Sequence, residues 1–451
     1  MNLLKEKISK IYFKYLIAAF GSAMISCIYG VVDMAVVGKY EGPNGTAALA
    51  IVAPLWNIIY SLGLLMGIGG STILSNIRGK NEKTNEDNQY FTTSLIGSII
   101  LSLLSWLLFI FFEKQLLIFF GGNDEVLLNL AITYLKPILF VFPLYLFNQM
   151  LAAFLRNDND PLLATLGVLA GGIFNIFGDI FFTFTLNMGI KGAGLATAIG
   201  SVISFLIMMS HFFKKKNTLR LIKVNNFFKK IKNVSITGFS TFFVDVAMGI
   251  ITILFNRQIM IYLSNDALSI YGIIINISTF VQCCAYSVGQ ASQPIISTNY
   301  GANKVNRINE TLKYSIITVM FFGVIWTLIS LIWPNMYIYI FMSPSKEILN
   351  IAPSIIRVYA LSFLILPFNI FSTYYFQSIM KPQIAFIVSV FRGIIISGTL
   401  IILLPLINKN ALWFAMPLTE LLIMIFALIM IIINTKQLNN KQKMALEMKN
   451  V

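Results

Sequence analysis

Twelve long apolar segments constrain the fold of this 451-residue chain more than any other feature. A helix needs about 20 residues to cross the hydrocarbon core of a membrane. The segments cover residues 11–37, 47–76, 90–112, 131–155, 161–186, 190–212, 234–263, 268–299, 312–340, 351–379, 383–407 and 410–433. They are continuously apolar rather than alternating, which excludes a membrane β-barrel. The sequence therefore predicts an all-α integral membrane protein with twelve transmembrane helices, and it excludes a large extramembrane enzyme head.

The basic residues predict how the chain is oriented. The chain has 33 Lys and Arg against 18 Asp and Glu, for a net charge of +15. If the N-terminus is cytoplasmic, most of the basic residues fall in cytoplasmic segments, as the positive-inside rule requires. We therefore expect a multi-pass protein of the cell membrane with both termini in the cytoplasm. Its basic excess is expected to face anionic membrane lipids, and no nucleic acid partner is needed to explain it.

A hydrophilic, basic stretch divides the twelve segments into two groups of six. Residues 1–212 form a predicted N-terminal lobe, 213–233 a cytoplasmic linker, 234–433 a C-terminal lobe and 434–451 a cytoplasmic tail. Six is an even number, so both lobes enter the membrane from the same side. The sequence thus predicts two lobes related by a pseudo-two-fold axis along the membrane normal, a plan that transporters use for alternating access.

An internal repeat supports this division. A shift of 222 residues pairs Gly67, Ile73, Ser75, Gly79 and Asn81 with Gly289, Ile295, Ser297, Gly301 and Asn303. A shift of 221 residues pairs Pro161, Ala164, Gly172, Ile173 and Asn187 with Pro382, Ala385, Gly393, Ile394 and Asn408. The two shifts agree within one residue, so the halves share one architecture.

Four motifs in this order resemble the multidrug and toxic compound extrusion (MATE) transporters. They are YGVVDMAVVG at 29–38, RGK at 78–80, QPIISTNYGA at 293–302 and YFQSIMKP at 375–382. The resemblance spans both predicted lobes. It implies secondary active efflux of organic compounds, coupled to an ion.

Four acidic residues lie within the apolar segments, namely Asp33, Asp179, Asp245 and Glu420. A central Asp costs about 2.5 to 3.5 kcal/mol on insertion scales, so each of them needs a partner or a function. The alternatives are a structural ion pair, a permanently protonated carboxyl group, or a site for a transported ion.

Depth in the membrane distinguishes one set of polar residues. Asp33, Asn175, Asp179 and Thr197 fall at a similar depth in the outer half of the N-terminal lobe, and Asn175 and Asp179 share a helical face. The matching positions of the second half are apolar: Phe255, Ile396, Leu400 and Leu418. The resemblance implies that the four polar residues form a coupling-ion site. Oxygen ligands suit a hard cation such as Na⁺, but they could equally carry a proton.

Other charged residues have open interpretations. Asp245 could be functional or structural. Arg392 and Glu420 lie near mid-membrane and are expected to form an interhelical ion pair, with attraction of a cationic substrate as the alternative. The only histidine, His211, lies at the cytoplasmic end of its segment and is expected to be solvated, which excludes histidine as the proton carrier.

A substrate cavity is expected near the interface of the lobes. Its candidate residues are polar, aromatic or flexible: Tyr29, Asn148, Gln149, Met150, Asp245, Asn276 and Gln282. Aromatic faces attract organic cations, and methionine adapts to varied ligands.

These patterns favour a multidrug efflux transporter that exchanges cationic, amphipathic compounds for Na⁺ or H⁺ and contributes to antibiotic resistance. The alternative is a lipid-linked glycan flippase of the same superfamily. No HExxH, Cys–His pair or nucleotide-binding loop is present, so we expect neither an enzyme nor a cofactor. The chain is expected to act as a monomer on small organic substrates.

Overall fold

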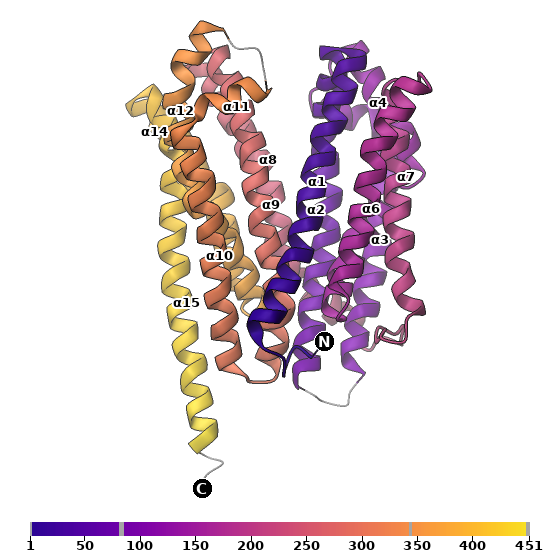
Figure 1. Ribbon diagram of the computed structural model, residues 1–451, viewed down its shortest axis with the longest axis vertical. Helices are drawn as coiled ribbons and strands as arrows, with labels where there is room; N and C mark the ends of the chain where they lie inside the picture. The colour runs from indigo at the N-terminus through magenta and orange to yellow at the C-terminus, as the bar shows by residue number, and fades with distance from the viewer. Residues whose placement is uncertain (1, 81–84, 342–344, 448–451) are drawn as a thin grey trace. The chain divides into compact units, whose positions relative to one another are not determined.

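A computed structural model describes residues 2–80, 85–341 and 345–447, and nearly all of these residues are helical. Fifteen α-helices occur in the described ranges (Figure 1): α1 (Ile8–Glu41), α2 (Pro43–Lys80), α3 (Glu86–Phe119), α4 (Glu125–Leu139), α5 (Phe142–Asn157), α6 (Pro161–Ile180), α7 (Ile190–Met209), α8 (Phe227–Tyr262), α9 (Asn265–Gly301), α10 (Val305–Ile332), α11 (Pro334–Phe341), α12 (Lys346–Ser378), α13 (Pro382–Val390), α14 (Ile396–Ile407) and α15 (Ala415–Glu447). Short π-helical turns, η1 (Phe181–Thr185) and η3 (Phe391–Ile395), and short 3₁₀ turns, η2 (Ser210–Phe213) and η4 (Lys409–Phe414), extend four of these helices.

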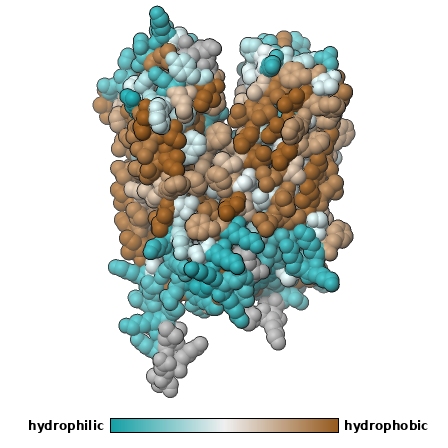
Figure 2. All heavy atoms as spheres, in the orientation of Figure 1, coloured by the Kyte–Doolittle hydropathy of each residue, from teal (hydrophilic) through white to brown (hydrophobic). Residues whose placement is uncertain are grey.

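The described helices are long and apolar enough to cross a membrane. Eleven of them, counting helices that continue into a short turn, pass this test alone, and the bent pair α4 and α5 makes a twelfth span. Large apolar side chains such as Phe111 (72% exposed) and Phe177 (69% exposed) point away from the protein. Figure 2 shows this apolar surface along the helices and a hydrophilic band at one end. The prediction of an all-α, multi-pass membrane protein is confirmed.

The fourth span differs from the single helix expected over residues 131–155. Helix α4 ends at Leu139 and α5 begins at Phe142, with a bend of 62° between them. Pro143 lies in the first turn of α5, where its missing N–H and fixed backbone angle are well tolerated. The proline favours a new helix start at this point, although other helices of the chain contain an internal proline, such as Pro294 in α9.

The chain forms two compact units. The N-terminal unit comprises residues 17–77 and 82–242, and the C-terminal unit comprises 1–16, 78–81 and 243–451. The boundaries of these units differ from those of the predicted lobes, and several of them fall inside helices. Helix α1 changes unit after Leu16, α8 changes unit after Phe242, and the last turn of α2 belongs to the C-terminal unit.

Specific contacts attach the start of the chain to the C-terminal unit. The ring of Tyr12 stacks on Tyr314 at 5.8 Å, and its hydroxyl donates to Thr318 Oγ1 at 3.0 Å. Arg307 Nη2 donates to the carbonyl oxygens of Leu3 at 2.8 Å and Glu6 at 2.7 Å. Within this unit, the start of α1 and the end of α15 lie at the same end (Figure 1), as an even number of spans requires.

The linker is held in place along the N-terminal unit. Residues 214–226, called the strap below, run against the first turns of α3. Backbone N–H groups of Arg220 and Ile222 donate to Asn88 Oδ1 at 2.8 Å and Thr92 Oγ1 at 3.1 Å. The N–H of Asn225 donates to Gln89 Oε1 at 3.1 Å. The strap is thus a fixed element, although its composition resembles that of a flexible linker.

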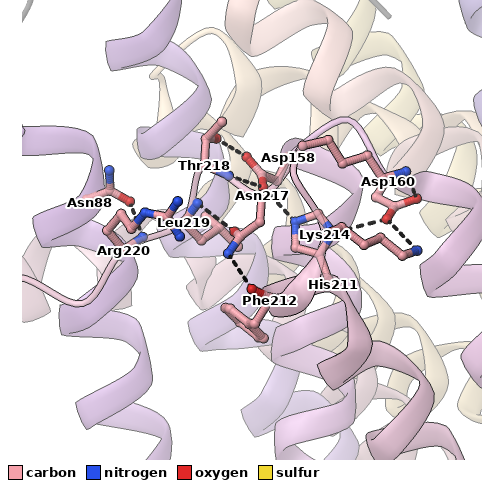
Figure 3. Close-up of polar contacts among 11 residues, drawn as sticks. Asn88, Asp158, Asp160, His211, Phe212, Lys214, Asn217, Thr218, Leu219 and Arg220 are labelled. Atoms are coloured by element: carbon pink, nitrogen blue, oxygen red, sulfur yellow. Dashed lines mark hydrogen bonds and ion pairs between the residues drawn. The ribbon is translucent and has the colours of Figure 1, made fainter.

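His211 begins this arrangement, and the expectation that it is solvated was wrong. Its side chain is fully buried between two carboxylates (Figure 3). Nε2 lies 2.6 Å from Asp158 Oδ2, and Nδ1 lies 3.0 Å from Asp160 Oδ2. Carboxylates only accept hydrogen bonds, so both ring nitrogens must donate and the imidazole is protonated. His211 therefore acts as a structural cation that joins the end of α7 to the turn between α5 and α6.

Asp160 pairs with three cationic side chains of this cluster, the first of which is His211. Lys216 Nζ lies 2.7 Å from Asp160 Oδ1, and Lys214 Nζ lies 3.3 Å from Asp160 Oδ2. Burial alone would raise the pKa of the Asp160 carboxyl, but the hydrogen bonds from His211 and Lys216 outweigh it and hold the pKa well below its usual range. Asp158 in turn accepts from the backbone N–H of Thr218 at 3.0 Å, which fixes the start of the strap.

Candidate cation site

Asp33 lies on α1 within the N-terminal unit and is 8% exposed. Its Oδ2 accepts a 2.7 Å hydrogen bond from the hydroxyl of Tyr134 on α4. The same hydroxyl lies 3.4 Å from Thr197 Oγ1 on α7. Tyr134 therefore links two of the predicted site residues.

Asn175 and Asp179 lie one turn apart on α6 and complete the cluster. The amide nitrogen of Asn175 donates to Asp179 Oδ1 at 3.3 Å and to Thr197 Oγ1 at 3.0 Å. Asp179 is fully buried, and Asn175 is 3% exposed. The structure thus brings Asp33, Asn175, Asp179 and Thr197 into one hydrogen-bonded network, built from four helices.

Small residues allow these helices to approach closely. A Cβ at Gly171 would collide with Ser204 and would lie 2.5 Å from the carbonyl oxygen of Gly200, which faces it from α7. A Cβ at Gly194 would collide with the carbonyl oxygen of Tyr134 on α4. Close contacts between small residues are the usual way for transmembrane helices to pack. Here they accompany the contact of Tyr134 with Thr197 and the contact of Thr197 with Asn175 on α6.

The network leaves three buried acceptor oxygens without a hydrogen-bond partner among the described residues. They are Asp33 Oδ1, Asn175 Oδ1 and Asp179 Oδ2. An unsatisfied buried oxygen costs about 1 to 3 kcal/mol, and more when it is charged. In addition, the carboxyl groups of Asp33 and Asp179 are close enough to interact electrostatically. A cation or a proton would relieve both costs.

The end of α6 has an irregular backbone next to the site. Asp179 is followed after Ile180 by the π-helical turn η1. Such turns are rare and often occur at functional sites, because the extra residue per turn alters the direction of side chains. Thr183 within η1 is buried, and its hydroxyl has no hydrogen-bond partner among the described residues.

Tyr134 was not anticipated from the sequence. It lies three residues into the apolar segment 131–155, at its outer end, and therefore at about the depth of Asp33. The depth comparison that selected the other four residues would have selected it too, if tyrosine hydroxyls had been included. Its contact with Asp33 joins residues 101 positions apart, which no local pattern encodes.

A small polar cavity adjoins the network inside the N-terminal unit. Its volume is about 50 Å³, enough for a few water molecules. Its walls come from α1, α5, α6 and α7, and the lining residues are Ser26, Tyr29, Tyr145, Asn148, Gln149, Val168, Gly171, Gly172, Asn175, Thr197, Gly200, Ser201 and Ser204. The cavity therefore connects the site residues Asn175 and Thr197 with three residues predicted for substrate binding.

Those three residues are Tyr29, Asn148 and Gln149. The hydroxyl of Tyr29 lies 2.8 Å from that of Tyr145, and Asn148 Nδ2 donates to the carbonyl oxygen of Ser201 at 2.9 Å. The fourth candidate on this side, Met150, is fully buried and packs against Gly67 instead of lining the cavity.

The remaining substrate-cavity candidates lie in the C-terminal unit. Asp245 Oδ1 accepts a 2.6 Å hydrogen bond from Tyr286, and Gln282 Nε2 contacts Met248 Sδ at 3.1 Å. Asn276 donates to the carbonyl oxygen of Gly272 on its own helix at 3.1 Å. Their polar groups therefore have partners within the unit, although Asp245 Oδ2 has none among the described residues.

Arg392 and Glu420 form a closed ion pair in the C-terminal unit. Arg392 Nη2 lies 2.7 Å from Glu420 Oε1, and Asn369 Nδ2 donates to Glu420 Oε2 at 2.6 Å. Glu420 is fully buried and Arg392 is 5% exposed.

At the repeat position of Asp33, Phe255 is buried and stacks on Tyr271 at 4.7 Å. The polar network of the N-terminal unit thus has no counterpart at the repeat position of Asp33 in the C-terminal unit, where an aromatic residue is packed instead.

The chain matches one family model and several known transporters. The MatE family model matches residues 18–181 and 239–400. A protein described as multidrug export protein MepA from Staphylococcus saprophyticus is 24% identical over 413 residues, covering 91% of this chain and 90% of that protein. A protein of the same description from Staphylococcus aureus is 25% identical over 413 residues, with 90% of both covered.

Solved structures show the same fold. One is described as the outward-facing conformation of a multidrug resistance MATE family transporter, with a TM-score of 0.88 at 20% identity over 97% of this chain and 98% of that one. A transporter of the MOP superfamily from Pyrococcus furiosus has a TM-score of 0.88 at 19% identity with the same coverage. These likenesses extend over both units.

Proposed function

Because the chain belongs to the MatE family of multidrug and toxic compound extrusion transporters, we propose that it exports organic, cationic and amphipathic compounds in exchange for Na⁺ or H⁺. Relatives described as multidrug export proteins match about nine-tenths of the chain, which supports the substrate class. The proposed cycle is alternating access by a single chain in the cell membrane, with both termini in the cytoplasm.

One observation carries the proposal of ion coupling. Asp33 Oδ1, Asn175 Oδ1 and Asp179 Oδ2 are buried acceptors without partners among the described residues, while the donors Tyr134 and Asn175 already bond the neighbouring oxygens. This pattern leaves only acceptors for an incoming ligand. A neutral donor such as water could satisfy these oxygens, but only a cation or a proton would also neutralise the buried carboxylates.

The ligand atoms fit an alkali cation better than a transition metal. They are carboxylate, amide and hydroxyl oxygens, which hard cations prefer. Within the described ranges, no group of three or more His, Cys, Asp or Glu side chains is arranged to hold a metal ion. Na⁺ is accordingly the candidate coupling ion, and H⁺ is the alternative because two neighbouring carboxyl groups can also share a proton.

In the proposed cycle, binding of the ion from outside replaces the drug and resets the carrier. The ion neutralises the Asp33 and Asp179 carboxylates, so that a cationic drug loses its electrostatic attraction to the N-terminal unit. The names of the relatives favour drug export over the lipid-linked glycan flippase.

Transport by purified protein in liposomes tests this proposal. A cationic dye is loaded, and a Na⁺ gradient and a pH gradient are imposed separately. We expect dye movement with at least one gradient in the wild type, and loss of it in Asp33→Asn and Asp179→Asn. Asp266→Asn, at the start of α9 and outside the site, is the matched control and should transport normally.

A binding measurement separates the two ions. Na⁺ should raise the melting temperature of the wild type relative to choline at equal ionic strength, and should leave both site variants unchanged, because a ligand stabilises only the state that binds it. A response to pH alone would assign coupling to protons. Normal export by both variants would overturn the assignment of the site.

A further inference from the structure

We propose that the strap, with the helix ends on either side of it, is a preformed docking site for the headgroups of anionic phospholipids. This role is independent of the transported compound. It concerns a segment that connects the two halves of the chain and that the cation site does not involve.

Two exposed aromatic side chains bracket the strap. Phe213 is 88% exposed and ends the span that begins at Ile190. Phe228 is 85% exposed and is the second residue of α8, which begins the next span. Side chains at the ends of membrane spans lie at the depth of the lipid headgroups. Both phenyl rings are thus placed to enter the boundary between headgroups and acyl chains.

Basic residues follow each of these aromatic residues directly. Lys214 and Lys216 both pair with Asp160, and Lys230 pairs with Glu86 at 3.3 Å. The remaining cations of this region are exposed and make no ion pair among the described residues: Lys215, Arg220, Lys223, Lys229 and Lys232. The region therefore has a net positive charge that the protein itself does not balance.

The strap cannot move freely, so its cations are held near the membrane surface. Its first residues are fixed through His211 and Asp158 (Figure 3), and its later residues through Asn88 and Thr92 of α3. A fixed surface loses less conformational entropy on binding than a flexible linker would. The unpaired cations and the exposed rings together match an amphiphile with an anionic headgroup, and a soluble anion would leave the rings unpartnered.

The test compares lipid retention by purified protein. Wild type in detergent is titrated with phosphatidylglycerol and, separately, with phosphatidylcholine, and bound lipids are counted by native mass spectrometry. We expect preferential retention of phosphatidylglycerol. The triple variant Lys215→Gln, Lys223→Gln, Lys229→Gln should bind it about 100-fold more weakly, from about 1 kcal/mol for each cation at an anionic surface.

Two matched variants exclude a general effect of charge. The variant Lys436→Gln, Lys441→Gln, Lys443→Gln removes the same charge from the exposed end of α15 and should retain phosphatidylglycerol like the wild type. Replacing Lys215, Lys223 and Lys229 by arginine keeps the charge and should also preserve retention. Equal retention of both lipids by the wild type, or an equal loss in the α15 variant, would overturn the proposal.

Substitution of the two aromatic residues provides a second, independent test. Phe213→Ser with Phe228→Ser should weaken retention of phosphatidylglycerol, while Phe119→Ser with Phe140→Ser, which removes rings of 80% and 85% exposure away from the strap, should not. Unchanged retention in the first pair would show that the rings do not contact lipid, and the amphiphile-specific site would be rejected.

Discussion

Tyr134 donates a 2.7 Å hydrogen bond to Asp33 from a helix that ends in a 62° bend. The bond engages Asp33 Oδ2 and leaves Oδ1 buried without a partner among the described residues. The tyrosine therefore orients the carboxylate and keeps one oxygen available for a ligand. Outer groups of this kind commonly tune ion affinity without binding the ion themselves.

Tyr134→Phe is expected to weaken ion coupling while the protein stays folded. Loss of an orienting hydrogen bond typically lowers ion affinity 10- to 100-fold. The concentration of Na⁺ or H⁺ that gives half-maximal dye export should rise by about that factor. Tyr337→Phe, which removes a hydroxyl bonded to Ser330 in the C-terminal unit, is the control and should leave it unchanged.

Substitutions of Thr197 test whether its hydroxyl oxygen takes part in the site. Thr197→Val keeps the shape of the side chain but removes the hydroxyl that accepts from Asn175. We expect coupled export to fall at least tenfold, since an oxygen of the network is lost and a buried amide N–H loses an acceptor. Thr197→Ser restores the hydroxyl and should restore export. Full activity in the valine variant would mean that the hydroxyl takes no part.

Gly171→Ala should disturb the contact between α6 and α7. The added Cβ would lie 2.5 Å from the carbonyl oxygen of Gly200, so a backbone must move. Overpacking of this kind costs about 1 to 3 kcal/mol, and the melting temperature and coupled export should both decrease. Gly30→Ala adds the same methyl group where no atom lies within 4 Å, and it should be tolerated.

Variants of the Arg392–Glu420 pair distinguish a structural role of the pair from attraction of a cationic substrate. Arg392→Met and Glu420→Gln should each destabilise the protein by about 3 to 5 kcal/mol, because each leaves a partner buried alone. The double variant should lose less free energy of unfolding than the sum of the losses in the two single variants. If instead Glu420→Gln melts like the wild type but no longer transports cationic dyes, the carboxylate attracts substrate and the structural interpretation fails.

The lowered pKa of the Asp160 carboxyl predicts that the stability of the protein depends on pH in the acid range. Its pKa is held below that of an unfolded carboxyl group, about 3.9. Its stabilisation is therefore complete above about pH 4 and is lost as pH falls toward the folded-state pKa. Asp160→Asn should lower the melting temperature at pH 6 to 7, and the difference from the wild type should shrink below pH 4. A difference that does not vary with pH would contradict this linkage.

The parts of the fold that could be predicted depend on properties repeated along the chain. Apolar length identified the spans, with the α4–α5 bend as the one departure. Asp33, Asn175, Asp179 and Thr197 could be selected because polar groups within spans are costly and because the second half has apolar residues at the matching positions. Composition and depth were enough to group these residues, and their role in ion coupling stays a prediction.

The parts that could not be predicted depend on partners distant in sequence. His211 stands 51 residues after Asp160, and nothing in its own neighbourhood indicates that it is buried as a cation. The strap has the composition of a loop, yet three side chains of α3 hold its backbone. Tyr134 bonds Asp33 across 101 residues of sequence, from a helix whose backbone packs against Gly194 of α7. Each is a tertiary contact that local pattern does not record.

The closed ion pair of the C-terminal unit bears on the electrical behaviour of the protein. Arg392 and Glu420 sum to zero charge at one location, so the transmembrane voltage performs no net work on them if the unit moves. An elementary charge crossing the membrane gains or loses about 2.3 kcal/mol per 100 mV. Any voltage dependence of transport must then arise elsewhere. In the proposed cycle its sources are the coupling ion at Asp33 and Asp179, the cargo, and Asp245, whose carboxyl accepts a hydrogen bond from Tyr286.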